Sequence, residues 1–205
     1  MLKRPRIIWL ESTKSTNDDA ARLICELDNL SVVAAKSQSE GRGQGDHKWH
    51  SAPGENIMAS FVLKYPPLTP PPSGQTLLLT EVVTMAVREY ILFRGVNSQI
   101  KWFNDILVEG RKICGILIEN SFIGGAMTHT IAGIGLNINE TDFPEDLPNP
   151  VSLKQLTGKE YDVATELQAL QSEMEKSALL LQSEEGRKSL NDYFREHCFN
   201  IPEGH

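Results

Sequence analysis

Four short apolar runs follow one another between residues 99 and 134, and the connections between them most constrain the fold. The runs QIKWF (99–103), ILVE (106–109) and KICGILIE (112–119) are separated by spacers of two residues, Asn-Asp and Gly-Arg, which form turns readily. Gly124-Gly125 makes another turn, and the next run continues to about Ile134. Because turns this tight join antiparallel strands, the runs predict a mainly antiparallel sheet.

Further strands and helices are indicated on both sides of this region. Strands are expected at 6–10, 31–36 and 56–64, and helices at 16–27, 75–93, 163–182 and 185–198. The first helix opens with Ser15 or Thr16 as its cap, and the second has an amphipathic pattern. Segments 65–74 and 139–150 are rich in proline and are predicted to be loops. The order indicates an α+β fold, a mixed and mainly antiparallel sheet backed by helices.

Composition excludes several classes of protein. The chain has 205 residues, enough for one domain with a substantial core, and 40% of them are hydrophobic. A formal net charge of −7, with no basic block, disfavours a DNA-binding protein, because such proteins neutralise phosphates. No apolar run approaches the roughly 20 residues of a membrane helix, and three widely spaced cysteines suit reduced thiols. We therefore expect a cytoplasmic protein.

The segment QSEGRGQGDHKWHSAPGEN (38–56) is the most informative for chemistry. Its alternating glycines allow the backbone to approach a bulky anion, and Arg42 and Lys48 can supply positive charge to phosphate oxygens. On these residues alone, a solvated flexible loop is an equally good interpretation. The segment matches neither GxGxxG nor GxxxxGK[ST], so it predicts neither a Rossmann nor a P-loop site.

Polar residues interrupt the apolar pattern of KWFNDILVEGRKICGILIE (101–119). Asn104, Asp105 and Lys112 lie at predicted strand ends, where side chains often face a site, although ordinary hairpin turns explain them too. Gly115 is less easily explained, because a glycine inside a buried strand costs stability and commonly marks close approach of a ligand or another backbone.

Two shorter motifs have a structural and a functional interpretation each. Ser15 and Thr16 open the first helix, where they cap it or present hydroxyl groups to a small polar head group. In GIGLNIN (133–139), Asn137 either ends a strand in a turn or faces a site.

Five motifs together resemble, in their order and spacing, the catalytic domain of biotin protein ligases, also called biotin–[acetyl-CoA-carboxylase] ligases. The motifs are KSTN, GRGxxxxKW, KWxNDI, RKxxGIL and GIGLNIN. The resemblance is strong over residues 7–140 and looser to 185. It implies a fold similar to class II aminoacyl-tRNA synthetases, with a catalytic domain at 1–185 and a C-terminal helix at 186–205. The DNA-binding segment of repressor-type members and the small SH3-like C-terminal domain are not matched.

The same resemblance implies roles for individual residues. The implied biotin-binding residues are Ser15, Thr16, Gln38, Gly41, Arg42, Trp49, Lys112 and Gly115. The implied ATP-binding residues are Arg42, Lys48, Trp49, Lys101, Asn104 and Asn137. The implied catalytic residues are Lys112, Arg42 and Asp105, and Asp105 is also the candidate ligand of a Mg²⁺ ion.

The activity implied is ATP-dependent conversion of biotin to biotinyl-5′-AMP, followed by transfer of biotin to a lysine of a biotin carboxyl carrier protein. By analogy with family members, edge strands near 127–134 are expected to pair between two subunits of a homodimer. Gln44, Gly45 and Asp46 depart from the family pattern, which has more basic residues in this loop. Weaker retention of the adenylate is the expected consequence.

Two other functions remain open at the level of sequence. A lipoate ligase or octanoyl transferase shares the broader fold and also transfers an acyl group to lysine. A non-catalytic module that binds biotin or a carrier protein would need no activating cation. Pyrophosphate release with each acid separates the two enzymes, and the absence of any adenylate would identify the module.

Overall fold

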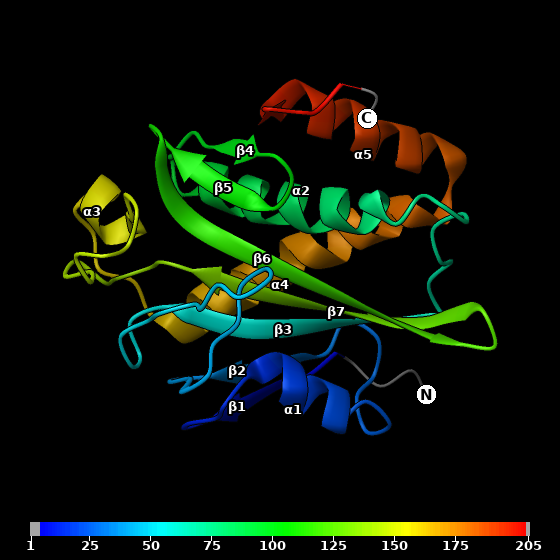
Figure 1. Cartoon of the computed structure of the whole chain (residues 1–205), viewed down its shortest axis with the longest axis horizontal. Coiled ribbons are helices and arrows are strands. Elements are labelled where there is room, and N and C mark those ends of the chain that lie inside the picture. The colour runs from blue at the N-terminus through cyan, green and yellow to red at the C-terminus, as the bar shows by residue number, and fades with distance from the viewer. Residues whose placement is uncertain (1–4, 204–205) are drawn as a thin grey trace.

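The computed structural model describes residues 5–203 and contains one mixed sheet with helices on both faces (Figure 1). The strand order is β1-β2-β3-β7-β6-β5-β4-β8, and only the β1/β2 and β4/β8 pairs are parallel. The strands are β1 (Ile7–Leu10), β2 (Val32–Ala35), β3 (Ile57–Lys64), β4 (Gln99–Lys101), β5 (Asp105–Val108), β6 (Arg111–Ile123), β7 (Ala126–Leu136) and β8 (Cys198–Phe199). The expected α+β class with a mainly antiparallel sheet is therefore confirmed.

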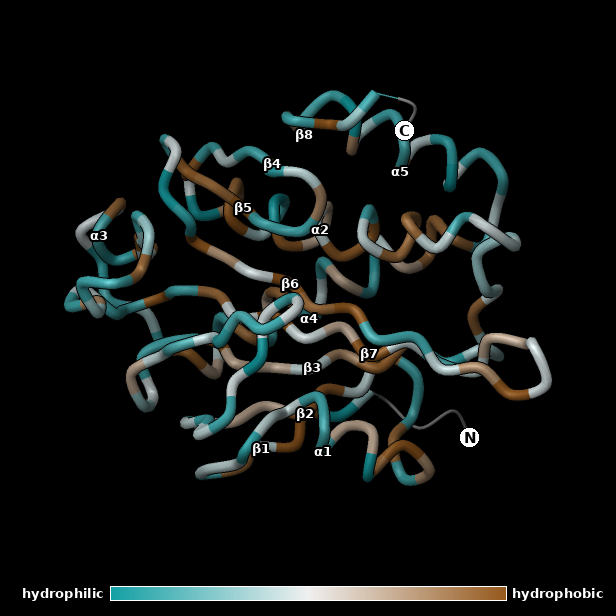
Figure 2. Tube along the Cα trace, in the orientation of Figure 1, coloured by the Kyte–Doolittle hydropathy of each residue, from teal (hydrophilic) through white to brown (hydrophobic). Residues whose placement is uncertain are grey.

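The helices divide unequally between the two faces of the sheet. They are α1 (Thr16–Arg22), α2 (Leu77–Phe93), α3 (Leu153–Thr157), α4 (Val163–Leu179) and α5 (Glu184–His197), with a 3-10 turn at Leu180–Gln182. In Figure 1 α2 and α4 lie behind the sheet and α5 packs against α2 at the top of the view, whereas α1 lies in front of the β1–β3 end. Figure 2 shows a largely apolar α2 and a largely polar α5, as expected for an inner and an outer helix.

Alternation along the strands separates two apolar clusters. Val32 and Phe61 belong to the large cluster beneath α2 and α4, whereas their neighbours Val33 and Val62 belong to a small cluster with Ala20 of α1. Successive residues of a strand point to opposite faces, so β2 and β3 each contribute to both clusters. Because α1 covers only part of its face, the centre of the sheet is left to a long loop and a cavity.

Most predicted elements are present, with shifted ends. The first helix ends at Arg22, earlier than its apolar spacing indicated, and Leu27 reaches the small cluster through turns. β6 and β7 are longer than expected because they pair with each other nearly to the Gly124-Gly125 turn. α3 and β8 were not predicted, since five and two residues are too few to show a periodic pattern.

The expectation of a free edge near residues 127–134 is wrong. β7 lies between β3 and β6, and residues 129–134 pair with strands on both sides. A long, central apolar strand and a long edge strand look alike in sequence, and only the pairing order separates them. The two outermost strands of the described sheet are β1 and β8.

The C-terminal part of the described chain completes this sheet. β8 pairs in parallel with β4, and the Trp102 amide donates to the Phe199 carbonyl at 3.1 Å. The helix expected at 185–198 is therefore followed by a strand of the same sheet, while the domain boundary expected at 185 stays a prediction. None of the described helices combines the length and apolar character that crossing a bilayer requires.

Candidate active site

A cavity of about 300 Å³ lies on the face of the sheet that α1 only partly covers. It is lined by residues from every motif singled out in the sequence. The predicted residues that line it are Ser15, Thr16, Gln38, Arg42, Lys48, Trp49, Lys101, Asn104, Asp105, Lys112 and Gly115. Gly41 and Asn137 are the predicted residues that do not line it. The motifs thus converge in space although their lining residues run from Ser15 to Gly135 in the sequence.

Glycines of the two central strands form the floor beneath the indole of Trp49. Gly135 of β7 pairs with Gly115 of β6, and Asp105 of β5 continues the same row. A Cβ atom on Gly135 would lie 2.2 Å from Trp49 Cε2, and one on Gly115 would lie 2.9 Å from Trp49 Cζ3. Both positions must be glycine if the ring is to lie this close to the sheet.

The glycine loop (residues 41–48) is a small hairpin that crosses the sheet in front of β6 (Figure 1). The Trp49 amide donates to the Gly41 carbonyl at 2.9 Å, and the Gly43 amide donates to the His47 carbonyl at 2.7 Å. A Cβ on Gly41 would lie 2.5 Å from the Trp49 carbonyl oxygen. Gly41 thus permits the close packing of the two chain segments at the base of the hairpin. It packs against the backbone of Trp49 and does not line the cavity.

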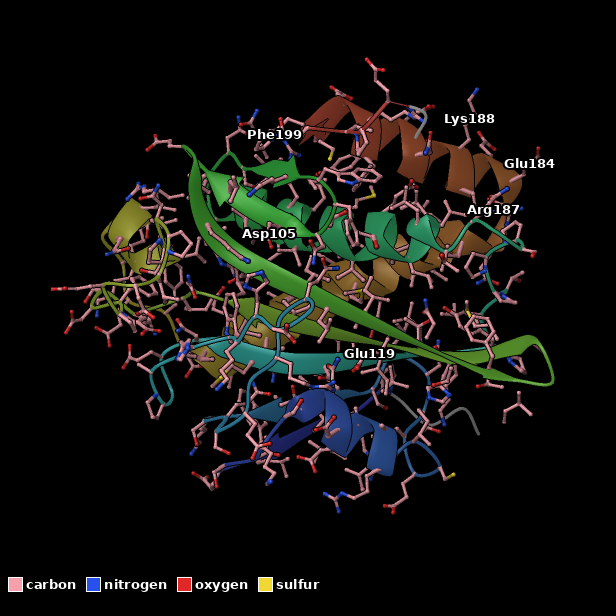
Figure 3. All side chains as sticks on the ribbon, viewed as in Figure 1. Asp105, Glu119, Glu184, Arg187, Lys188 and Phe199 are labelled. Carbon is pink, nitrogen blue, oxygen red and sulfur yellow. The ribbon has the colours of Figure 1, made fainter. Side chains whose placement is uncertain are left out.

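The strand ends bring an ammonium group and a carboxylate together. Lys112 Nζ lies 2.8 Å from Asp105 Oδ1, and it also lies 5.8 Å from the centre of the Trp49 ring. Both side chains are only partly exposed, at 34% for Lys112 and 24% for Asp105. The amide of Asn104 donates to the Ile116 carbonyl at 2.6 Å, which ties the turn before β5 to β6. Figure 3 shows Asp105 on the strand next to the long β6.

Polar groups of α1 and its neighbours surround the other end of the cavity. Ser15 occupies the cap position of α1, but its side chain makes no capping hydrogen bond. The Thr16 amide donates to Gln38 Oε1 at 2.7 Å, and the Ser60 hydroxyl donates to Thr16 Oγ1 at 2.8 Å. Ser15 is therefore not a conventional side-chain cap, and Thr16 and Gln38 are joined by a hydrogen bond beside it at the cavity wall.

Arg42 makes ion pairs at the rim of the cavity. Its guanidinium contacts Asp18 of α1 at 2.7 Å and Glu119 of β6 at 3.1 Å. Figure 3 shows Glu119 on the sheet side of α1. Asn137 is instead buried, and its amide donates to the Val151 carbonyl at 3.0 Å. In this structure Asn137 fastens the loop that follows β7.

Charge in the cavity is strongly one-sided. Its described lining carries four basic side chains, Arg42, Lys48, Lys101 and Lys112, and Asp105 as the one carboxylate, while the acidic partners of Arg42 lie at the rim. Cys114 lies on the opposite, helix-covered face, and burial raises the pKa of its thiol far above the usual range. An uncharged, buried thiol is a poor nucleophile, so Cys114 does not suit covalent catalysis. The basic side chains of the cavity lining suit the binding of an anion.

Several residues of the site were assigned no role from the sequence, although Asn17, Gly133 and Gly135 lie within the motifs KSTN and GIGLNIN. Asn17, Ser60, Glu119 and the two glycines of β7, Gly133 and Gly135, all contribute to it. A signal existed for the glycines, because residues two apart in a strand share a face. Asn17, Ser60 and Glu119 come from three different elements, and only tertiary structure brings them together.

The chain is similar to known proteins along most of this region. The model of the biotin/lipoate A/B protein ligase family matches residues 9–137. The bifunctional ligase/repressor BirA of Bacillus spizizenii is 37% identical over 141 residues, which cover 67% of this chain and 42% of BirA. A biotin–[acetyl-CoA-carboxylase] ligase of Paracoccus denitrificans is 33% identical over 163 residues, covering 75% of this chain and 65% of the relative.

A solved structure shows the same fold. The biotin protein ligase from Aquifex aeolicus, in complex with biotin and ATP, superposes with a TM-score of 0.80 at 23% identity, covering 97% of this chain and 84% of that protein. The chain thus spans about two fifths of the length of its Bacillus relative but most of the Aquifex structure. With a family model matching well over half of its residues, the chain belongs to the biotin/lipoate A/B protein ligase family.

Proposed function

We propose that this chain activates biotin with ATP and transfers it to a lysine of a biotin carboxyl carrier protein. The observation that carries the proposal is the cavity itself, in which four cations face one carboxylate beside an aromatic ring on a glycine floor. A biotin carboxylate and a nucleotide polyphosphate are both anions, so a site that binds them together needs fixed positive charge. The relatives named above are biotin ligases, which favours biotin over lipoate.

In the first step a carboxylate oxygen of biotin attacks the α-phosphorus of ATP. A new oxygen–phosphorus bond forms, and the bond to pyrophosphate breaks, with pyrophosphate taking the electron pair. We assign the cation that offsets the repulsion between these anions to Lys112, with Arg42 assisting at the rim. The carboxylate of biotin is already ionised near neutral pH, so positioned charge matters more here than proton transfer.

Asp105 and Trp49 support this role for Lys112. The ion pair with Asp105 holds the ammonium at the cavity wall while it remains accessible. The indole N–H of Trp49 is buried and has no hydrogen-bond partner among the described residues. A buried donor without an acceptor is costly, and an oxygen of a bound ligand would satisfy it. The remainder of the proposed biotin site is formed by Ser15, Thr16, Gln38 and Gly115. The proposed nucleotide site is formed by Lys48, Lys101 and Asn104. Asn137 would act on the nucleotide only indirectly, through the loop it fastens.

Magnesium fits this site as an ion carried by the nucleotide. No three His, Cys, Asp or Glu side chains within residues 5–203 are arranged to hold a metal by themselves. Mg²⁺ is commonly bound through one or two carboxylates together with substrate phosphates and water, and Asp105 is the carboxylate available here. When bound, the ion would neutralise charge on the departing pyrophosphate.

In the second step the amine of a carrier lysine attacks the acyl carbon of biotinyl-5′-AMP. A carbon–nitrogen bond forms, AMP leaves with the electron pair of the carbon–oxygen bond, and the amine loses a proton. Asp105 is the group we propose to orient or accept that proton.

The proposal also includes a cytoplasmic location and a homodimer. The homodimer is proposed by analogy with family members, and the strands at the edges of the described sheet are β1 and β8.

Lys112→Gln tests the proposal at its centre. A unit-charge pair about 4 Å apart at an effective dielectric near 20 is worth roughly 4 kcal/mol, so we expect pyrophosphate release to fall about a thousandfold. The measurement is pyrophosphate release with biotin and ATP, followed by labelled biotin on a purified carrier domain. Lys176→Gln, which removes an exposed lysine on α4, is the matched control and should leave the rate unchanged.

The outcomes separate the alternatives. Near-normal activity of the Lys112→Gln protein would refute the role of the lysine. Pyrophosphate release with lipoate or octanoate, but not with biotin, would identify the other branch of the family. Biotin binding without any adenylate would show a non-catalytic module.

A further inference from the structure

The turn between β4 and β5 carries much of the proposed nucleotide site. Lys101, Trp102, Asn104 and Asp105 all line the cavity. β5 is paired with the long β6 on its other side, whereas the other neighbour of the three-residue β4 is the two-residue β8. Pairing between strands this short is marginal by itself. The position of the turn therefore depends on contacts from outside the hairpin.

The end of β4 is attached to the C-terminal part of the described chain. The Trp102 amide donates to the Phe199 carbonyl of β8 at 3.1 Å, and Figure 3 shows Phe199 at the β4 end of the sheet. The Trp102 ring also lies edge-on against the Phe194 ring of α5, with centroids 6.0 Å apart and an angle of 69° between the planes. Phe194 is 2% exposed and belongs to the large apolar cluster, where close packing fixes its ring. A residue of the cavity wall thus rests on α5.

The beginning of β4 is attached to the same helix. Arg88 of α2 is 7% exposed, and its Nε donates to the carbonyl of Ser98, directly before β4, at 3.0 Å. Its NH1 group donates to the Tyr193 hydroxyl of α5 at 2.7 Å. A buried guanidinium that lost these acceptors would be costly, so the three elements are held together. β4 is therefore fastened at both ends through two consecutive residues of α5, Tyr193 and Phe194.

We propose that Phe194 is a positioning residue that, with the backbone of β8, fixes the β4–β5 turn at the cavity wall. Phe194 does not line the cavity, so it acts through Trp102. It also lies outside residues 9–137, which the family model matches. The consequence for catalysis rests on the proposed function, in which Lys101 and Asn104 of this turn contact the nucleotide. Misplacing such groups by about 1 Å is enough to slow a reaction severely.

The proposed biotin site is built from different elements. Thr16 is the first residue of α1, and its amide donates to Gln38 Oε1 at the other end of the cavity. Neither residue belongs to α5 or to the β4–β5 turn. A displaced turn should therefore affect the nucleotide and biotin unequally.

Phe194→Leu tests the proposal in the full chain, because it removes the ring contact with Trp102 and keeps an apolar side chain. In the pyrophosphate-release assay we expect the KM for ATP to rise about fivefold or more, while the KM for biotin changes by less than about twofold. Phe194→Met fills the space more fully and can place its sulfur against the indole, so it should restore part of the low KM for ATP.

Leu170→Ala is the matched control for lost stability. Leu170 is fully buried in the same apolar cluster, but it lies on α4, which packs against α2 and β3. The cavity it leaves destabilises the fold at least as much as Phe194→Leu, and both KM values should stay unchanged well below the unfolding temperature. An equal rise in the KM for ATP in the two variants, or an equal rise of both KM values in Phe194→Leu, would mean that Phe194 is merely structural and would overturn the proposal.

Hydrogen exchange of the Trp102 amide tests the positioning without any substrate. An amide at a short outer strand pair exchanges through local opening, so Phe194→Leu should accelerate its exchange about fivefold or more and Leu170→Ala should not. Unchanged exchange in Phe194→Leu, or an unchanged KM for ATP in that active enzyme, would overturn the proposal. If the parent protein releases no pyrophosphate with biotin and ATP, the proposed function is wrong, and exchange at Trp102 still decides whether Phe194 fixes the turn.

Discussion

At the scale of single residues, the site depends on side chains that are absent as much as on those that are present. Gly115, Gly133 and Gly135 lie on one face of two paired strands, and Trp49 and Asn17 fill the space above them. A side chain at any of these positions would occupy the volume of a group that the site uses. The glycines therefore determine how deeply the loop and α1 approach the sheet.

Gly135→Ala should displace the Trp49 ring and weaken biotin binding. The added methyl would lie 2.2 Å from Trp49 Cε2, and overpacking of this kind costs about 1–3 kcal/mol, which would correspond to a loss of affinity of about five- to 150-fold if it falls on the bound state. Calorimetric titration with biotin measures the effect.

The control for this prediction is a double-mutant cycle. In a Trp49→Leu background the same alanine should cost little, because the ring it collides with has been removed. If Gly135→Ala weakens binding equally in both backgrounds, the clash with Trp49 is not the cause.

Gln44→Arg should slow the release of biotinyl-5′-AMP. Gln44 lines the cavity but is uncharged, and a cation there would attract the phosphate of the adenylate. Because the position is exposed, the added interaction is worth about 0.5–1 kcal/mol, or a two- to fivefold slower release. Trapping the released adenylate after dilution measures the rate, and Gln44→Leu is the uncharged control. An unchanged release rate in the arginine variant would contradict the electrostatic argument.

At the scale of secondary-structure elements, the contact between α2 and α5 contains a buried charge outside the site. Glu81 of α2 is 2% exposed, and Asn191 of α5 donates to its Oε1 at 3.1 Å, whereas Oε2 has no partner among the described residues. Burial raises the pKa of Glu81 above its usual value, against the opposing effects of Asn191 and Arg195. The folded protein therefore binds a proton here more tightly than the unfolded chain does.

The pH dependence of stability follows from that shift. A raised pKa in the folded state stabilises the fold at pH values below the unfolded pKa of about 4.5, and this contribution is lost as the pH rises through the folded value. Glu81→Gln removes the titration, so its stability relative to the parent protein should increase between pH 4 and pH 8. Urea unfolding at several pH values measures this. A constant difference across that range would show that Glu81 titrates normally.

Sequence reasoning succeeded where elements are long and neighbours in the chain are neighbours in space. The meander from β4 to β7 follows from short spacers and alternating apolar runs, and α2, α4 and α5 follow from helical periodicity. It failed where a distant segment decides the outcome. The central position of β7 depends on its pairing with β3, and β8 exists because β4 offers it an edge.

At the scale of the whole molecule, the same division applies to the candidate site. The motif residues could be grouped because their order and spacing match a family, and the cavity places nearly all of them on its wall. The hydrogen-bonded network of Asn17, Ser60 and Glu119 could not be predicted, since its members are separated by as many as 102 positions. A pattern in one sequence carries no record of such contacts.

The β4–β8 pairing also has a consequence for the order in which a ribosome delivers this molecule. Lys101 and the backbone amide of Trp102, both beside the cavity, face an open strand edge until Phe199 has been synthesised. The strands from β1 to β7 can pair as they leave the exit tunnel, but this edge must wait until β8 has been synthesised. A nascent chain interrupted in α5 would therefore expose backbone groups next to the candidate site, where an unrelated strand could add to the sheet.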